Sequence, residues 1–258
     1  MKVVILCGGR GTRINEETTV RPKALVEIGD KPILWHIMKF YSHYGFNDFI
    51  ICLGYKGRMI KEYFLNYELM KNDFSMNLGT NDIALHGKSK EEDWKITFAE
   101  TGLDAQTGTR VKKIEKYIDE DAFMLTYGDG LTNADIGSIL KFHKSHGKIG
   151  TITGVHPLSR FGELVIEKHQ IVEFSKRSQI DKGYIDGGYM IFNKEFFDYL
   201  WDDNTCHLEL EPLEKLAEDG ESMVYLHNGF WQCMDTYREL EILNSLWKSP
   251  EPPWKIWK

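Results

Sequence analysis

The feature that most constrains this chain is its first 25 residues, in which a short apolar run leads directly into a glycine-rich loop. Residues 2–6 (KVVIL) have the composition of a buried strand, and residues 7–13 (CGGRGTR) follow at once. Residues 21–23 (RPK) add two more basic side chains. Glycines allow backbone N–H groups to face a ligand, and these donors complement a polyphosphate together with Arg and Lys. The segment therefore predicts a phosphate-binding loop, with an ordinary glycine-rich turn as the alternative.

The spacing excludes two common phosphate loops. A dinucleotide-binding fingerprint requires a glycine three positions after Gly11, where Ile14 stands. A P-loop requires a lysine directly after its last glycine, but Thr12 and Arg13 follow Gly11. The remaining pattern is GGxGTR with a PK pair about ten residues later.

This pattern resembles the N-terminal signature of the sugar-1-phosphate nucleotidylyltransferases, GGxGTRL followed by PKx[ML]. Within that superfamily the chain is most similar to the glucose-1-phosphate cytidylyltransferase family. Matching segments are spread over nearly the whole chain, at residues 15–18, 31–38, 54–57, 60–64, 127–130, 229–232, 234–236 and 253–255. The resemblance implies an enzyme that joins CTP and a sugar 1-phosphate, expected to be glucose 1-phosphate, and releases pyrophosphate. Its product would feed deoxysugar synthesis for a cell-surface polysaccharide.

Alternating apolar strands and amphipathic helices predict an α/β fold. The expected architecture is a Rossmann-like mixed, mainly parallel sheet flanked by helices, with a small β-rich sugar-binding part. Strands are expected at residues 2–6, 48–53, 94–99, 122–127, 149–155, 162–167, 171–174, 184–192 and 222–226. Helices are expected from residue 30 with Pro32 in the first turn, around residues 59–64, from residue 107 through Ile118, at 136–147, 194–201 and 208–218, and at 237–247.

One nucleotidyltransferase domain is expected over residues 1–258. Its nucleotide-binding part would span about residues 1–135, its sugar-phosphate-binding part about 136–240, and its C-terminal helix and tail about 237–258. Residues 66–93 show no pattern from which a conformation can be predicted. The tail at residues 250–258 is rich in Pro and Trp, which predicts packing on its own domain or on a neighbouring subunit.

Asp129 lies between two glycines after the apolar run at residues 122–127. Ligands of open parallel sheets bind beyond the carboxyl ends of the strands, so a carboxylate here is a candidate for chemistry, although Gly-Asp-Gly is also common in turns. The resemblance implies that Asp129 and Asp235 hold Mg²⁺. It also implies that Arg13 neutralises charge on the phosphates and that Lys23 holds the triphosphate.

The resemblance further implies two sets of binding residues. The nucleotide would be bound by Leu6, Cys7, Gly8, Gly9, Gly11, Thr12, Arg13, Lys23, Thr101, Arg110 and Gly128. The sugar phosphate would be bound by Gly162, Glu163, Lys176, Asp186, Gly187 and Gly188. Without the resemblance, residues 107–110 predict only a capped surface turn. Gly187 and Gly188, which are adjacent within a predicted strand, predict a bulge or a close backbone approach.

The sequence departs from the family pattern at several of these positions. Residues 175–177 read SKR where the family has EKP, and residues 186–188 read DGG where NGG is usual. Cys7 replaces an alanine, and Glu163 replaces a small residue. The nucleotidyl transfer is therefore better determined than the identity of the sugar or the strictness for CTP, and dTTP or UTP stay open.

Composition excludes several other classes of protein. A net charge of −7 argues against nucleic acid as a partner, because such binding needs a basic face. Cys7, Cys52, Cys206 and Cys233 are far apart and form no CxxC pair, which predicts free thiols of a cytoplasmic protein. No apolar run is long enough for a signal peptide or a membrane span. A homo-oligomer is expected, with residues 66–93 and the aromatic tail as candidate contact surfaces.

Two rival functions stay open at this stage. A glycosyltransferase that uses a nucleotide-sugar would need a DxD metal pair after a central strand, whereas residues 128–130 offer one acid. A nucleotide-binding subunit without catalysis is disfavoured because the full set of Arg13, Lys23, Asp129 and Asp235 is present.

Overall fold

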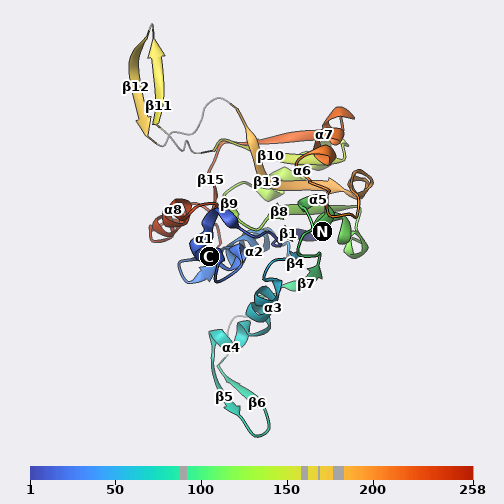
Figure 1. Cartoon of the computed structure of the whole chain (residues 1–258), viewed down its shortest axis with the longest axis vertical. Helices are drawn as coiled ribbons and strands as arrows, with labels where there is room; N and C mark the ends of the chain where they lie inside the picture. Colours follow the sequence, from blue (N-terminus) through green and yellow to red (C-terminus); the bar gives the residue numbers. More distant parts are fainter. Residues whose placement is uncertain (88–91, 158–161, 168, 177–182, 258) are drawn as a thin grey trace.

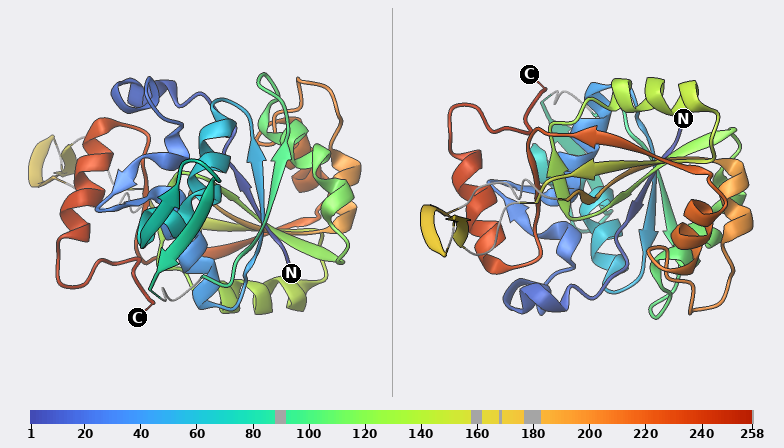
Figure 2. Two further views of the ribbon diagram at one scale, coloured as in Figure 1. Left: turned by 90° about the horizontal axis from the view of Figure 1, so that it is seen from below. Right: turned by 90° about the horizontal axis from the view of Figure 1, so that it is seen from above.

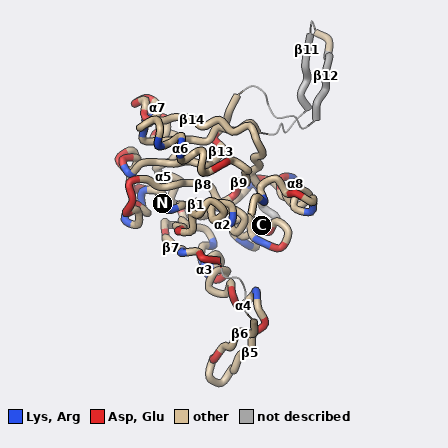
Figure 3. The backbone as a smooth tube through the Cα atoms, turned by 180° about the vertical axis from the view of Figure 1, so that it is seen from behind, with Lys and Arg blue, Asp and Glu red and all other residues tan. Residues whose placement is uncertain are grey.

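The computed structural model describes residues 1–87, 92–157, 162–167, 169–176 and 183–257, with the backbone alone for residues 15–16, 162–167 and 171–176. A central α/β body carries two β-hairpins that project from opposite ends (Figure 1). Among the described residues, no helix is both long and apolar enough to cross a bilayer. In Figure 3, basic and acidic positions are interspersed over the helices and loops around the sheet.

The body is built on one seven-stranded sheet with the order β14-β10-β13-β8-β1-β4-β7. β13 runs antiparallel to both of its neighbours, and the other pairs are parallel, which confirms the predicted mixed, mainly parallel sheet. The strands are β1 (Val3–Leu6), β4 (Asp48–Leu53), β7 (Lys95–Glu100), β8 (Ala122–Tyr127), β10 (Gly150–Val155), β13 (Ile185–Asn193) and β14 (Ser222–His227).

Helices cover both faces of this sheet (Figure 2). Alternate residues of β1 point to opposite faces, so Val3 and Ile5 join one core while Val4 and Leu6 join the other. The first core includes side chains of α2 (Ile33–His43), α3 (Gly57–Leu65), α6 (Ile136–His146) and α8 (Tyr237–Trp247). The second includes side chains of α5 (Thr107–Lys113) and α7 (Glu211–Glu218).

Strands with long apolar runs and helices with clear start signals were predicted well. β4, β8 and α8 have the predicted bounds. A capping box explains the start of α8, because Thr236 Oγ1 accepts from the Glu239 N–H and the Glu239 carboxylate accepts from the Thr236 N–H. α6 ends at Gly147, whose φ of 68° suits a helix end.

Four of the predicted helices have other bounds in the structure, beginning with those predicted from residues 30 and 107. α2 begins at Ile33, because Pro32 lies before it in the short antiparallel pair β2 (Glu27–Ile28) and β3 (Lys31–Pro32). The helix predicted from residue 107 through Ile118 ends at Lys113 and is followed by the 3₁₀ turn η3 (Glu115–Tyr117).

The helix predicted at residues 194–201 is the 3₁₀ helix η4 (Lys194–Tyr199), a tighter form common in short connectors. The helix predicted at 208–218 begins at Glu211, since Pro212 fits only the first turn of a helix.

Residues 66–93, for which no conformation was predicted, contain α4 (Tyr67–Lys71) and one of the projecting hairpins, β5 (Asp73–Asn77) with β6 (Asp82–His86). The other hairpin, β11 (Gly162–Glu167) with β12 (Gln170–Lys176), confirms a prediction, although residue 168 in its turn lies outside the described residues. The tail packs on its own domain, because Trp254 is fully buried and stacks on Phe230 and Trp247.

Candidate active site

A cavity of about 350 Å³ opens where β1 and β8 end, as expected for a parallel sheet. The glycine-rich loop and the segment after β8 both line this pocket. The start of α5 and the residue Glu209 line it as well. The lining residues are Leu6, Cys7, Gly8, Gly9, Gly11, Thr12, Arg13, Lys23, Ala24, Ala105, Gln106, Thr107, Arg110, Tyr127, Gly128, Asp129, Glu209 and Asp235.

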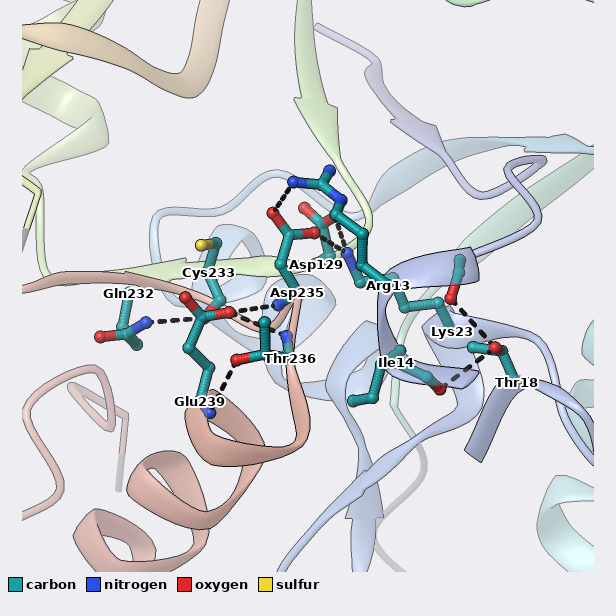
Figure 4. A network of polar contacts seen from close by, with 11 residues as sticks. Arg13, Ile14, Thr18, Lys23, Asp129, Gln232, Cys233, Asp235, Thr236 and Glu239 are labelled. Carbon is teal, nitrogen blue, oxygen red and sulfur yellow. Dashed lines mark hydrogen bonds and ion pairs between the residues drawn. The ribbon is translucent and has the colours of Figure 1, made fainter. Parts of the chain in front are cut away.

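Four predicted catalytic side chains meet in this pocket (Figure 4). The Lys23 ammonium lies 2.5 Å from Asp129 Oδ2 and 2.5 Å from Asp235 Oδ1. Arg13 Nη1 lies 2.7 Å from the other oxygen of Asp235. The Lys23 and Asp235 side chains are largely buried, whereas 69% of the Arg13 side chain is exposed at the pocket mouth. The cluster thus joins a buried ion triad to an exposed cation at the open side of the cavity.

A small strand pair brings the two aspartates together. Asp129 precedes β9 (Gly130–Thr132), and Asp235 follows β15 (Trp231–Cys233), and these strands pair antiparallel. The Met234 N–H also donates to the Asp129 carbonyl at 2.9 Å. The Asp235 N–H donates to the Glu239 carboxylate at 2.7 Å, which fixes the backbone at the start of α8. Backbone hydrogen bonds therefore set the position of both carboxylates.

The opposite charges of this cluster compensate one another in a partly buried site. Burial alone would lower the pKa of Lys23, but the two carboxylates outweigh it and raise the pKa above its usual value. Lys23 is therefore fully cationic at neutral pH. Two carboxylates this close together need such a cation, because their mutual repulsion in a partly buried site is otherwise large.

The same two carboxylates fit a divalent cation. Asp129 Oδ2 and Asp235 Oδ1 both contact one nitrogen at 2.5 Å, so they are no more than 5.0 Å apart and face one point. Oxygen ligands, few from the protein and the rest from phosphate and water, are what Mg²⁺ takes. Over the described ranges, no cluster of three or more His, Cys, Asp or Glu side chains is placed to hold a metal.

Arg110 supports the glycine-rich loop from below. Its guanidinium donates to the carbonyls of Gly8 at 3.1 Å, Leu53 at 3.0 Å and Gly102 at 2.7 Å, and to Thr101 Oγ1 at 2.8 Å. A Cβ on Gly8 would lie 2.2 Å from the Arg110 guanidinium, so only glycine fits there. Burial lowers the pKa of Arg110, but the group stays charged in any usual range.

Comparison with known proteins decides which family this pocket belongs to. A family model described as "Nucleotidyl transferase" matches residues 2–244. The chain belongs to the nucleotidyl transferase family. It is therefore an enzyme, a nucleotidyltransferase, and the rival prediction of a non-catalytic subunit loses its support.

Individual relatives agree with this assignment. The glucose-1-phosphate cytidylyltransferases of Salmonella typhi and of Salmonella typhimurium (strain LT2) are each 47% identical over 259 residues, with 100% of both chains covered. The resemblance to the glucose-1-phosphate cytidylyltransferase family is thus confirmed over the full length. The crystal structure of HddC from Yersinia pseudotuberculosis shares the fold, with a TM-score of 0.69 and 22% identity over 96% of this chain and 99% of that one.

Most predicted nucleotide-binding residues of this nucleotidyltransferase line the pocket, and Thr101 does not. Thr101 is buried, donates to the Leu53 carbonyl at 2.6 Å and accepts from Arg110, so it acts on the pocket through Arg110. Cys7 is buried under Gly128, and burial raises the pKa of its thiol well above the usual range. Cys7 therefore contributes a buried thiol to the lining of the pocket.

The predicted sugar-phosphate residues fall into two groups. Gly162, Glu163 and Lys176 lie on the β11–β12 hairpin, which projects from the body. The side chains of Glu163 and Lys176 lie outside the described part of the chain, as does residue 177. Their role stays a prediction.

The second group, residues 186–188, lies beside the pocket at an irregular register between β13 and β10. Asp186 Oδ1 accepts from the Gly188 N–H at 2.7 Å, and Gly188 has a φ of 75° and packs on the Tyr127 ring. The predicted bulge is confirmed. Desolvation, with the nearby Glu209 charge, raises the pKa of Asp186 to about 6 although the residue is still exposed at the surface.

Tyr127 and Glu209 line the pocket but were not predicted as site residues. Tyr127 OH donates to Glu209 Oε1 at 2.7 Å, and Thr107 Oγ1 donates to Glu209 Oε2 at 2.7 Å. No sequence signal pointed to Glu209, because it fell inside a segment predicted to be helical. The structure places it instead in the loop before α7, at the rim of the pocket.

Proposed function

We propose that this nucleotidyltransferase transfers CMP from CTP to α-D-glucose 1-phosphate and so forms CDP-glucose and pyrophosphate. The observation that carries the proposal is the convergence of Arg13, Lys23, Asp129 and Asp235 beside the glycine-rich loop. The relatives that match this chain at 47% identity over their full length are named for this reaction. The family match also favours nucleotidyl transfer over the rival glycosyl transfer.

In the proposed reaction, an oxygen of the sugar phosphate attacks the α-phosphate of CTP. The bond between the α-phosphate and the β-phosphate then breaks, and pyrophosphate leaves. The attacking phosphate is already ionised at neutral pH, so no residue has to serve as a general base. What the protein must supply is alignment of two anions and compensation of their charge.

Different residues of the pocket supply this alignment and this charge compensation. The backbone of residues 6–11 seats the base and the phosphates, and the exposed Arg13 guanidinium neutralises charge on the phosphates. Lys23 leaves the two carboxylates to hold the triphosphate. Asp129 and Asp235 bind the divalent cation, which we propose to be Mg²⁺. When bound, Mg²⁺ supplies positive charge that reduces the repulsion between the two substrates.

We also propose that the chain forms a homo-oligomer in the cytoplasm. One face of the β5–β6 hairpin carries the cross-strand pairs Phe74–Leu85 and Met76–Ile83, all of them exposed. The other face carries polar residues, among them Ser75 and His86 in a hydrogen bond. A two-stranded hairpin with a bare apolar face is marginally stable in water, and a second copy of the chain would cover it.

A matrix of nucleoside triphosphates against sugar 1-phosphates, read by pyrophosphate release with and without Mg²⁺, tests the function. We expect release that depends on CTP, glucose 1-phosphate and Mg²⁺ together. A preference for dTTP or UTP, or for another sugar 1-phosphate, would show that the proposed substrates are wrong, but nucleotidyl transfer would still be the reaction. Transfer of glucose from a nucleotide-sugar with no pyrophosphate release would overturn the transfer chemistry itself.

A further inference from the structure

Glu209 is held in a fixed position at the pocket rim by two elements. Its carboxylate accepts one hydrogen bond from the Tyr127 hydroxyl at 2.7 Å and one from the Thr107 hydroxyl at 2.7 Å. Thr107 is fixed in turn, because its hydroxyl accepts from the Leu208 N–H at 3.0 Å. Tyr127 is the last residue of β8, two positions before Asp129, and Thr107 is the first residue of α5. The carboxylate is therefore fixed in the lining of the pocket that also holds Asp129 and Asp235.

Within the described ranges, the charge of Glu209 is not compensated by an ion pair. Among the residues that the structure describes, no Lys or Arg side chain forms an ion pair with Glu209 or with Asp186. Both acids lie close enough to Tyr127 to raise the pKa of its hydroxyl far above the usual range, after the larger effect of desolvation. Among the described pocket residues, the carboxylate of Glu209 thus has no paired cation, whereas Arg13 and Lys23 are matched by Asp129 and Asp235.

A carboxylate without a paired cation repels phosphates, so Glu209 is suited to a part of the substrates that is not phosphate. A carboxylate has about four acceptor positions, and the Glu209 carboxylate uses one on each oxygen for Tyr127 and Thr107. The residue is exposed, so the remaining positions are open to a ligand. Sugar hydroxyls are the donors that both substrates carry next to their phosphates, and hydrogen bonds to a charged acceptor are stronger than neutral ones.

We propose that Glu209 is a specificity-determining residue that accepts a hydrogen bond from a ring hydroxyl of a substrate sugar. This inference rests on the proposed function and adds to it a contact for one of two sugars, the ribose of the nucleotide or the hexose of the sugar phosphate. The rival explanation is that Glu209 only ties the loop before α7 to Thr107 and Tyr127.

Steady-state kinetics of the full chain with hydroxyl-bearing and deoxy substrates separate these explanations. The variants are Glu209→Ala and Glu209→Gln, with Glu211→Gln as the matched control because Glu211 is exposed and lies outside the pocket lining. The ribose arm compares CTP with its 2′-deoxy and 3′-deoxy analogues. The hexose arm compares glucose 1-phosphate with its deoxy analogues. Thermal unfolding of each variant shows whether it is folded.

We expect Glu209→Ala to lower kcat/KM at least tenfold for the natural substrate of one arm and less than twofold for the deoxy analogue that lacks the contacted hydroxyl. The arm in which this difference occurs identifies the sugar, and Glu209→Gln should lose less than Glu209→Ala. An equal loss for natural and deoxy substrates in both arms, or no loss at all, would overturn the proposal in favour of the structural role.

Failure of the proposed function is a separate result. If the wild-type chain releases no pyrophosphate from any pair of substrates, calorimetric binding of CTP and of glucose 1-phosphate, each against its deoxy analogues, replaces the kinetic readout. A hydroxyl-dependent loss of affinity in Glu209→Ala would then support the Glu209 contact without the reaction. Equal losses for all ligands would overturn it.

Discussion

Asp129 and Asp235 face each other across a single ammonium, although 106 positions of sequence separate them. Both carboxylates lie 2.5 Å from Lys23 Nζ, which occupies the point where a divalent cation would be bound. The protein therefore carries an internal cation at its predicted metal site. Occupation of this site by a metal would require that the lysine move, and we propose the triphosphate as the anion that receives it.

Asp129→Asn should lower turnover about 100-fold or more, because an amide binds Mg²⁺ far less well than a carboxylate does. The fold should be unchanged, since the backbone pairing of β9 with β15 does not involve the side chain. Pyrophosphate release and circular dichroism measure the two effects. Asp121→Asn, an exposed acid just before β8, is the matched control. Turnover near that of the wild type would show that Asp129 has no metal role.

Lys23→Met should lower the free energy of unfolding by about 1–3 kcal/mol in metal-free buffer, because it leaves two partly buried carboxylates facing each other without a cation. Addition of Mg²⁺ should restore part of this loss, since the vacated point suits a divalent cation. Urea unfolding with EDTA or with Mg²⁺ measures both effects. Lys95→Met, which removes an exposed ion pair with Asp48, should show little change and no response to Mg²⁺. A Lys23→Met variant that Mg²⁺ does not stabilise would contradict the metal assignment.

Gly8→Ala should weaken nucleotide binding about tenfold and lower the free energy of unfolding by about 1–3 kcal/mol. The added Cβ would overlap the Arg110 guanidinium, which cannot swing aside without losing its bonds to several carbonyls. Calorimetric titration with CTP measures the first effect and urea unfolding the second. Gly9→Ala is the control for the unfolding measurement alone, because a Cβ on Gly9 would meet no protein atom within 4 Å beyond its chain neighbours. Equal unfolding free energies of the two variants would refute the role of Arg110.

The folded protein should lose stability below neutral pH because of His36. Its Nε2–H donates to the Ile28 carbonyl at 3.0 Å, and its Nδ1 accepts from Trp254 Nε1 at 3.4 Å, so the ring is held neutral. Burial lowers the pKa of His36 from 6.5 to about 4. The unfolded chain therefore binds a proton below pH 6.5 that the folded chain rejects until pH 4, and stability should fall by about 3 kcal/mol over this window.

The pH dependence of urea unfolding for His36→Gln and the wild type tests this effect. The slope of unfolding free energy against pH should be smaller in His36→Gln by up to about 1.4 kcal/mol per pH unit between pH 4 and 6.5. His43→Gln, on the exposed side of α2, is the matched control variant. An unchanged slope in His36→Gln would mean that His36 is not the group that titrates.

Phe74→Asp should reduce the size of the proposed homo-oligomer, because a charge on the apolar face of the β5–β6 hairpin would have to be buried against a second copy. Light scattering after size-exclusion chromatography measures the mass. Ala84→Asp places the same charge on the opposite face of the hairpin and should leave the mass unchanged. A monomeric wild-type chain would refute the proposal outright.

The sequence predicted those parts of the fold that have a local signal. Long apolar runs located β4 and β8, and the capping pattern located α8. The meeting of Asp129 with Asp235 depends on two three-residue strands, which are too short to show any periodicity. Glu209 was missed for a related reason, since the Leu and Glu residues around it read as helix and only Pro212 sets the true start of α7.

The pairing of β9 with β15 also limits how this protein can be altered. Successive side chains of a strand point to opposite sides, so one residue inserted between Trp231 and Asp235 would turn the carboxylate away from Lys23. Substitutions within β9 or β15 that keep the chain length would leave the direction of the Asp235 carboxylate unchanged. The number of residues between each aspartate and the nearest paired residue, Gly130 for Asp129 and Cys233 for Asp235, should therefore be held constant when this enzyme is engineered.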